Sequence, residues 1–183
     1  MDKYKGKKGY ISLLKRYDLI FILVSALIAL GVFMIGLNIW NTKKNIGTVV
    51  AVLSLLPACK RLTNLIMIFS FKGISEENYA KVAPLVKPEW LVLEDMLFST
   101  EKYILEFDHV VLSGSKMFAL SKMSKDKNDY IKEYFETAFK KRAIDLTFNL
   151  YSNVNDYAGV LKRMEGESFE NEKATDYILS LLV

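Results

Sequence analysis

The sequence is poor in the residues that stabilise small folds through disulfides or metal ions. Its 183 residues include one cysteine, Cys59, and one histidine, His109. A single cysteine excludes an intramolecular disulfide framework and a cysteine-based zinc site. The chain also lacks a glycine-rich phosphate loop and a nucleophile elbow. We therefore expect no cofactor and no metal, and we interpret His109 as a structural residue.

Acidic residues are scarce in the first 71 positions, where only Asp2 and Asp18 occur. Residues 1–17 hold six basic residues, whereas residues 72–183 hold fifteen basic and nineteen acidic ones. The basic excess therefore precedes the C-terminal part, which argues against a domain that binds nucleic acid through bulk charge. It favours a basic leader, residues 1–17, that contacts anionic lipid and keeps the N-terminus in the cytoplasm.

Charge is completely absent from residues 19–40. Twenty-two helical residues extend about 33 Å, which exceeds the roughly 30 Å of a bilayer's hydrocarbon core. We predict a membrane span over residues 18–40. A short polar loop, residues 41–45, then turns the chain back into a second apolar segment.

The second segment predicts a span over about residues 46–65, which completes a membrane hairpin over residues 18–71. It is interrupted by Lys60 and Arg61, and Pro57 predicts a kink one turn before them. Pairing the two arms places Lys60 opposite Ala26, roughly 12 Å inside Asp18.

Two interpretations of this basic pair remain open. In the first, the second span ends near Cys59 and the next apolar residues form an interfacial helix. In the second, the helix continues to Phe71 and the pair faces a subunit interface, a pore or an anionic lipid. Because ionisable residues inside a membrane mark functional sites, Lys60, Arg61 and Pro57 are candidate functional residues.

Residues 72–183 predict a small cytoplasmic α+β domain. Their patterns indicate, in order, a helix from Ser75, an ambiguous segment over 89–100 that suits a strand, strands over 102–112 and 116–123, a helix over 129–142, a strand over 144–150, a helix over 154–164 and a final helix near 174–181. Tyr103, Leu105, Phe107 and Val111 are expected on one face of their strand. The core order is helix-strand-strand-strand-helix-strand-helix.

This order, together with residues 106–122 (EFDHVVLSGSKMFALSK), resembles the middle of the nuclease-related (NERD) domain, which has a restriction-endonuclease-like fold. The resemblance places the family's metal-binding aspartate on Asp108 and its lysine on Lys122, with Glu106 as a neighbouring acid. The family's glutamate falls on Leu120, which has no oxygen to bind Mg²⁺. Glu94 and Asp95 could donate a carboxylate to a site with Asp108, but we interpret them as a solvated pair.

The sequence gives no complete catalytic set, so the leading hypothesis is a non-enzymatic membrane module. Its cytoplasmic domain would bind a partner or ligand and signal to the hairpin, in a homo-oligomer or with a membrane partner. One alternative is a membrane-tethered nuclease-like hydrolase that acts on nucleic acid. Another is an effector whose hairpin disrupts the bilayer when the domain senses a ligand.

Overall fold

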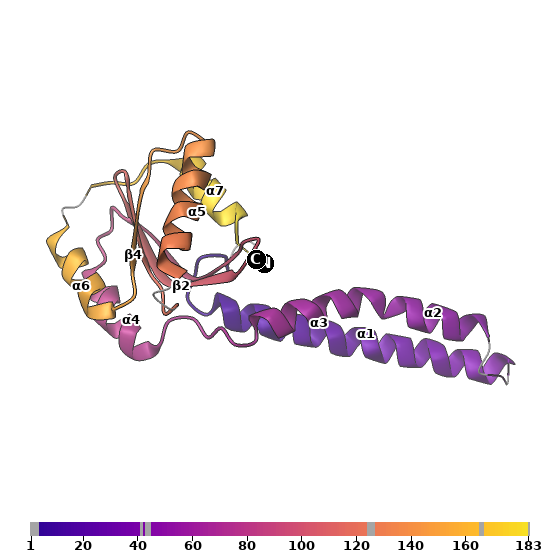
Figure 1. The fold of residues 1–183 in the computed structure, drawn as a ribbon. Coiled ribbons are helices and arrows are strands. Elements are labelled where there is room, and N and C mark those ends of the chain that lie inside the picture. Colours follow the sequence, from indigo (N-terminus) through magenta and orange to yellow (C-terminus); the bar gives the residue numbers. More distant parts are fainter. Residues whose placement is uncertain (1–3, 41, 43–44, 124–126, 165–166, 183) are drawn as a thin grey trace. The chain divides into compact units, whose positions relative to one another are not determined.

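The computed structural model describes residues 4–40, 42, 45–123, 127–164 and 167–182. The chain divides into two compact units (Figure 1). One unit, Ser12–Phe71, is a helical hairpin, and the other combines Met1–Ile11 with Lys72–Val183. The first eleven residues of the predicted leader thus belong to the same unit as the C-terminal domain.

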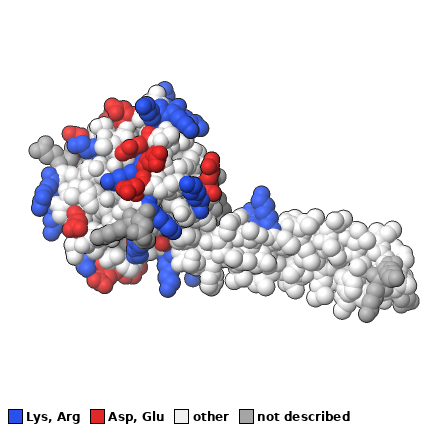
Figure 2. Space-filling view, in the orientation of Figure 1, with Lys and Arg blue, Asp and Glu red and all other residues white. Residues whose placement is uncertain are grey.

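Two helical stretches of the hairpin are long and apolar enough to cross a membrane. The first is α1 (Tyr10–Trp40), and the second comprises α2 (Ile46–Ser54) and α3 (Leu56–Ile68). Their 31 and 23 residues extend about 46 and 35 Å, both more than a hydrocarbon core of roughly 30 Å. The visible face of this unit carries little charge (Figure 2).

The turn of the hairpin is fixed by Asn45, the N-cap of α2. Its Oδ1 accepts a hydrogen bond from Thr48 N at 2.8 Å, and its Nδ2 donates to Gly36 O at 3.1 Å. Gly36 and Gly47 lie so close that a Cβ on Gly47 would come within 2.8 Å of Gly36 Cα. Lys43 and Lys44 of the predicted loop lie outside the described residues.

The second arm is interrupted between α2 and α3. Leu55 separates the two helices, and Pro57 lies in the first turn of α3, where a missing N–H costs little. The break thus occurs two residues before the proline that predicted a kink. Beyond it, α3 continues past Lys60 and Arg61 as far as Ile68.

The second unit is built on a four-stranded mixed sheet. Its strands are β1 (Leu91–Ser99), β2 (Ile104–Ser113), β3 (Lys116–Leu120) and β4 (Thr147–Tyr151). They lie in the order β1-β2-β3-β4; the first two pairings are antiparallel and β3–β4 is parallel. The ambiguous segment is thus a strand, and the predicted hairpin turn joins β2 to β3.

Helices cover both faces of this sheet (Figure 1). They are α4 (Glu76–Val82), followed by a 3₁₀ turn (Ala83–Leu85), α5 (Asn128–Lys141), α6 (Val154–Arg163) and α7 (Glu172–Ser180). α5 and α7 enclose one apolar core, to which Phe135 and Ile178 contribute. α4 and α6 enclose a second core, to which Val82 and Tyr157 contribute. The predicted order of elements is confirmed.

Side chains alternate between the two faces of the sheet along β1 and β2. Near the middle of each strand, the positions that face the α5–α7 core change from odd to even residue numbers. Leu105 and Phe107 lie in the α5–α7 core, but Val111 lies in the α4–α6 core, so the prediction that the three share a face is wrong. The shift coincides with Asp95, whose φ of 49° is the left-handed conformation that interrupts a regular strand.

Candidate functional site

The side chains that the resemblance assigns to a site lie close together around β2. Asp108 projects from β2 and is completely buried, and Lys122 follows the end of β3. The Lys122 Nζ lies 3.0 Å from Oδ2 and 3.2 Å from Oδ1 of Asp108. Lys122 also donates to the carbonyl oxygen of Gly73 at 3.0 Å.

Glu106, two residues earlier on β2, is engaged by backbone groups. Its Oε1 accepts hydrogen bonds from Lys72 N at 3.1 Å and from Gly73 N at 2.9 Å. These two residues follow directly after the hairpin unit. Glu106 therefore holds the chain where it returns from the hairpin.

Asp95 holds the chain on both sides of the hairpin. One carboxylate oxygen accepts from Ile74 N at 2.8 Å, and the other accepts from Gly9 N at 2.5 Å. The side chain is only 3% exposed, so the interpretation of Asp95 as a solvated residue is wrong. Gly73, at φ +73°, leaves room for this carboxylate, because a Cβ at Gly73 would collide with it.

Glu94 adds a third attachment next to Asp95. Its Oε2 accepts from Lys8 N at 3.0 Å, and its own backbone N–H donates to Gly6 O at 2.9 Å. We call Glu94, Asp95 and Glu106 the carboxylate clamp. Together they hold backbone groups in residues 6–9 and 72–74, the segments that precede and follow the hairpin.

The electrostatics of the site follow from burial. Burial raises the pKa of Asp108, and the ammonium of Lys122 opposes that rise. Burial also raises the pKa of Glu94. The pKa of His109 is lowered to about 4 by burial, so its imidazole is neutral at pH 7. Its Nδ1 lies 2.9 Å from the Tyr157 hydroxyl.

The clamp carboxylates are acceptors for backbone amides, and this limits their chemistry. Leu120, 2% exposed, occupies the position where the resemblance requires a glutamate. Among the described residues, no three His, Cys, Asp or Glu side chains are placed to hold a metal ion together. What the arrangement does is fix two chain segments, because hydrogen bonds between carboxylates and amides are charge-assisted and strong.

No known protein family, curated protein or solved structure matches this chain. The candidate site therefore rests on the geometry of its own residues.

The two residues of the basic pair, Lys60 and Arg61, have different surroundings in the structure. Arg61 Nη1 lies 3.2 Å from Oδ1 of Asp18, a carboxylate that is 1% exposed. The guanidinium also lies 5.5 Å from the ring centroids of Tyr17 and Phe21. Lys60 is exposed and has no ion pair with any residue that the structure describes.

Sequence reasoning missed Asp18 as the partner of Arg61. The sequence does contain a feature that indicates this pair, because Asp18 is the only acidic residue among residues 12–71. An isolated acid at the edge of an apolar helix, with a basic pair on the returning helix, is the pattern expected of a paired charge. Pro57 lies in the first turn of α3 and has no backbone N–H to donate.

Proposed function

We propose that the protein is a membrane-anchored, non-enzymatic module. The hairpin spans the membrane twice with both chain ends in the cytoplasm, and residues 72–183 bind a partner or ligand. Two long apolar helices and the concentration of basic residues before the first span support this topology. Blue and red side chains are interspersed over the visible face of the C-terminal domain (Figure 2), as on a surface exposed to water.

The observation that carries the proposal is the double attachment made by Asp95. Gly9 is the last residue before α1, and Ile74 is the third residue after the hairpin unit. Because one carboxylate binds both, a displacement of β1 alters both ends of the hairpin together. The clamp is thus suited to pass a change in the domain to the hairpin.

The full chain in native membranes tests this coupling through its only cysteine. Cys59 is exposed on α3, so oxidative cross-linking reports whether hairpins of two copies meet. We expect cross-linked dimers, and we expect Asp95→Asn to change their yield. The matched control is Asp145→Asn, which makes the same substitution at an exposed position outside the clamp.

Two results together would contradict the proposal. One is a strict monomer in membranes and in detergent. The other is unchanged behaviour in cells of the Lys60→Ala/Arg61→Ala variant, because a functional hairpin depends on these charges.

The contact between Asp108 and Lys122 favours one second candidate, a nuclease-like hydrolase. In it Asp108 would bind a metal ion and Lys122 would stabilise developing charge. Metal-dependent cleavage of DNA or RNA by the full chain, abolished in Asp108→Ala, would support this activity. Equal cleavage by Asp108→Ala and the unmodified chain would attribute it to a contaminant.

A further inference from the structure

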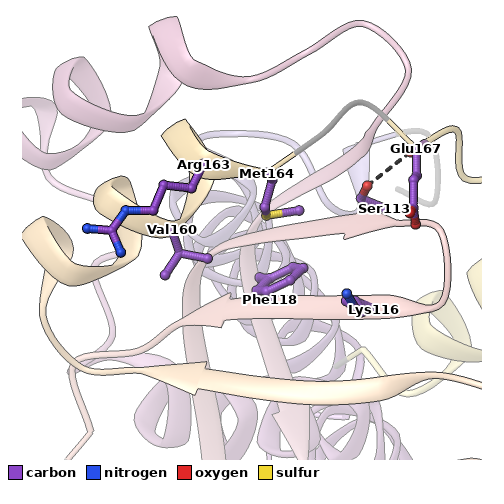
Figure 3. Close-up of a pocket in the computed structure, with 7 residues that line it drawn as sticks. All are labelled: Ser113, Lys116, Phe118, Val160, Arg163, Met164 and Glu167. Carbon is purple, nitrogen blue, oxygen red and sulfur yellow. Dashed lines mark hydrogen bonds between the residues drawn. The ribbon is translucent and has the colours of Figure 1, made fainter.

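A pocket of about 380 Å³ lies between the C-terminal end of α6 and the hairpin of β2 and β3 (Figure 3). Phe118, Val160 and Met164 form its apolar part, and Lys116, Arg163 and Glu167 supply charged groups. The volume lies in the range of sites for small molecules. The pocket shares no lining residue with the carboxylate clamp.

The apolar part of the pocket is an open extension of the α4–α6 core. Phe118 is 6% exposed and belongs to that core, while Val160 and Met164 are partly buried against it. An apolar body placed over these three side chains would cover carbon surface that now faces water. Its binding would therefore gain from the hydrophobic effect.

The walls of the pocket are held in place by hydrogen bonds. Lys87 Nζ donates to the carbonyl oxygen of Met164 at 2.6 Å, at the end of α6. Ser113 Oγ donates to the carbonyl oxygen of Glu167 at 3.0 Å, the dashed contact in Figure 3. Gly114 allows Glu167 to lie against the turn, because a Cβ at Gly114 would collide with the Glu167 carboxylate.

The charged groups of the pocket favour an anion. Lys116 and Arg163 are both exposed, and neither side chain makes a hydrogen bond or ion pair with another described residue. Arg163 extends at one end of the pocket, and Glu167 lies over Ser113 at the other (Figure 3). Among the described lining residues, two cations face one carboxylate, and neither cation has an ion-pair partner in the part of the chain that the structure describes.

We propose that this pocket binds a small organic anion, one carboxylate or phosphate group on an apolar body. The anionic group pairs with one of the two cations, Arg163 or Lys116, which lie toward opposite ends of the pocket (Figure 3), and the body covers Phe118, Val160 and Met164. The proposal rests on the proposed function in one respect, that the C-terminal domain is the part of the protein that binds a ligand.

Phenyl phosphate is a suitable probe, because it combines the two features that the pocket recognises. The full chain in neutral-detergent micelles is labelled with ¹³C at its methionine methyl groups, and the Met164 signal is identified by its loss in Met164→Leu. We expect phenyl phosphate to shift this signal saturably. Inorganic phosphate and benzyl alcohol, which each lack one feature, should bind more weakly than the probe.

Variants that remove basic side chains test whether the pocket itself binds phenyl phosphate. Lys116→Ala/Arg163→Ala should weaken binding about tenfold or more, since charge-assisted contacts are lost. Lys132→Ala/Lys162→Ala removes the same charge from exposed positions outside the pocket and should leave the affinity unchanged. No saturable shift, or equal weakening in both double variants, would overturn the inference. A continued response of Cys59 cross-linking to Asp95→Asn would show that the membrane module survives such a result.

Discussion

Asp95 owes its role to residues that are distant in sequence. Its two backbone partners are 86 and 21 positions away, so no local pattern relates them to it. Its φ of 49° also places it where few residues other than glycine, asparagine and aspartate are found. Side-chain type and hydropathy indicate a solvated acid at this position, and only the tertiary fold reveals a buried acceptor.

His109 is a second residue whose neighbourhood could not be predicted. The sequence indicated a structural histidine, and the structure supplies its partners: the Tyr157 hydroxyl at 2.9 Å from Nδ1 and Glu94 Oε1 at 4.0 Å from Nε2. Glu94 belongs to the clamp. Protonation of His109 would therefore place a charge in a buried position next to a clamp carboxylate.

The lowered pKa of His109 predicts a loss of stability in acid. The pKa is about 4 in the folded protein against an ordinary 6.5, so between these values the unfolded chain binds a proton that the folded chain does not. The free energy of unfolding therefore decreases as pH falls from 6.5 to 4, by about 3 kcal/mol from this residue alone. Urea unfolding of the full chain at several pH values measures it.

His109→Gln is the control for this pH dependence. The raised pKa values of Glu94 and Asp108 act in the opposite direction, because the folded chain then takes up protons more readily than the unfolded one. Both carboxyls are retained in His109→Gln, so subtracting its pH profile isolates the histidine. Parallel profiles for the two proteins would contradict the prediction.

At the scale of elements, periodicity predicted the type and order of helices and strands well. The helix over 129–142 corresponds to α5, and the turn at Ser113–Ser115 joins β2 to β3. The predicted strand over 144–150 begins only at Thr147, after a turn in which Ala143 has a φ of 51°. Alternating residues before Thr147 mimic a strand, and their pattern does not reveal that the backbone is still turning.

The hairpin helices give a prediction that separates the two members of the basic pair. Arg61→Ala leaves the buried Asp18 carboxylate without its cation, whereas Lys60→Ala removes an exposed side chain. We expect Arg61→Ala to destabilise the hairpin by about 2 kcal/mol, less than for a fully buried pair because the Arg61 side chain is 37% exposed. Lys60→Ala should cost less than about 0.5 kcal/mol.

Loss of helical circular dichroism during titration of the micelle-bound chain with SDS compares these two variants. Asp18→Asn, alone and combined with Arg61→Ala, completes a double-mutant cycle that isolates the pair. Equal effects of Lys60→Ala and Arg61→Ala would show that the contact with Asp18 adds nothing to hairpin stability.

At the scale of the whole molecule, the distribution of acidic residues agrees with the division of the chain into two units. The hairpin unit contains one acid, Asp18, and the other unit holds all the others. Of the residues that the family resemblance assigns to a site, Glu106 accepts hydrogen bonds from Lys72 N and Gly73 N, and Asp108 lies against the ammonium of Lys122. The sequence pattern does not reveal that backbone amides occupy the Glu106 carboxylate, because Lys72 and Gly73 are more than thirty positions away in sequence.

The depth of the second arm is tested by the accessibility of Cys59. If the stretch Ile46–Ile68 spans the membrane, Cys59 lies about 20 Å of helix from Ile46, within the hydrocarbon core. A membrane-impermeant maleimide should then label it only after detergent is added. In a Cys59→Ser background, Ser70→Cys should react in sealed vesicles with the cytoplasmic face outward, and Thr42→Cys should not. Labelling of Cys59 as fast as Ser70→Cys would instead place the end of the span before Cys59, with α3 at the interface, because both thiols would then be in contact with water.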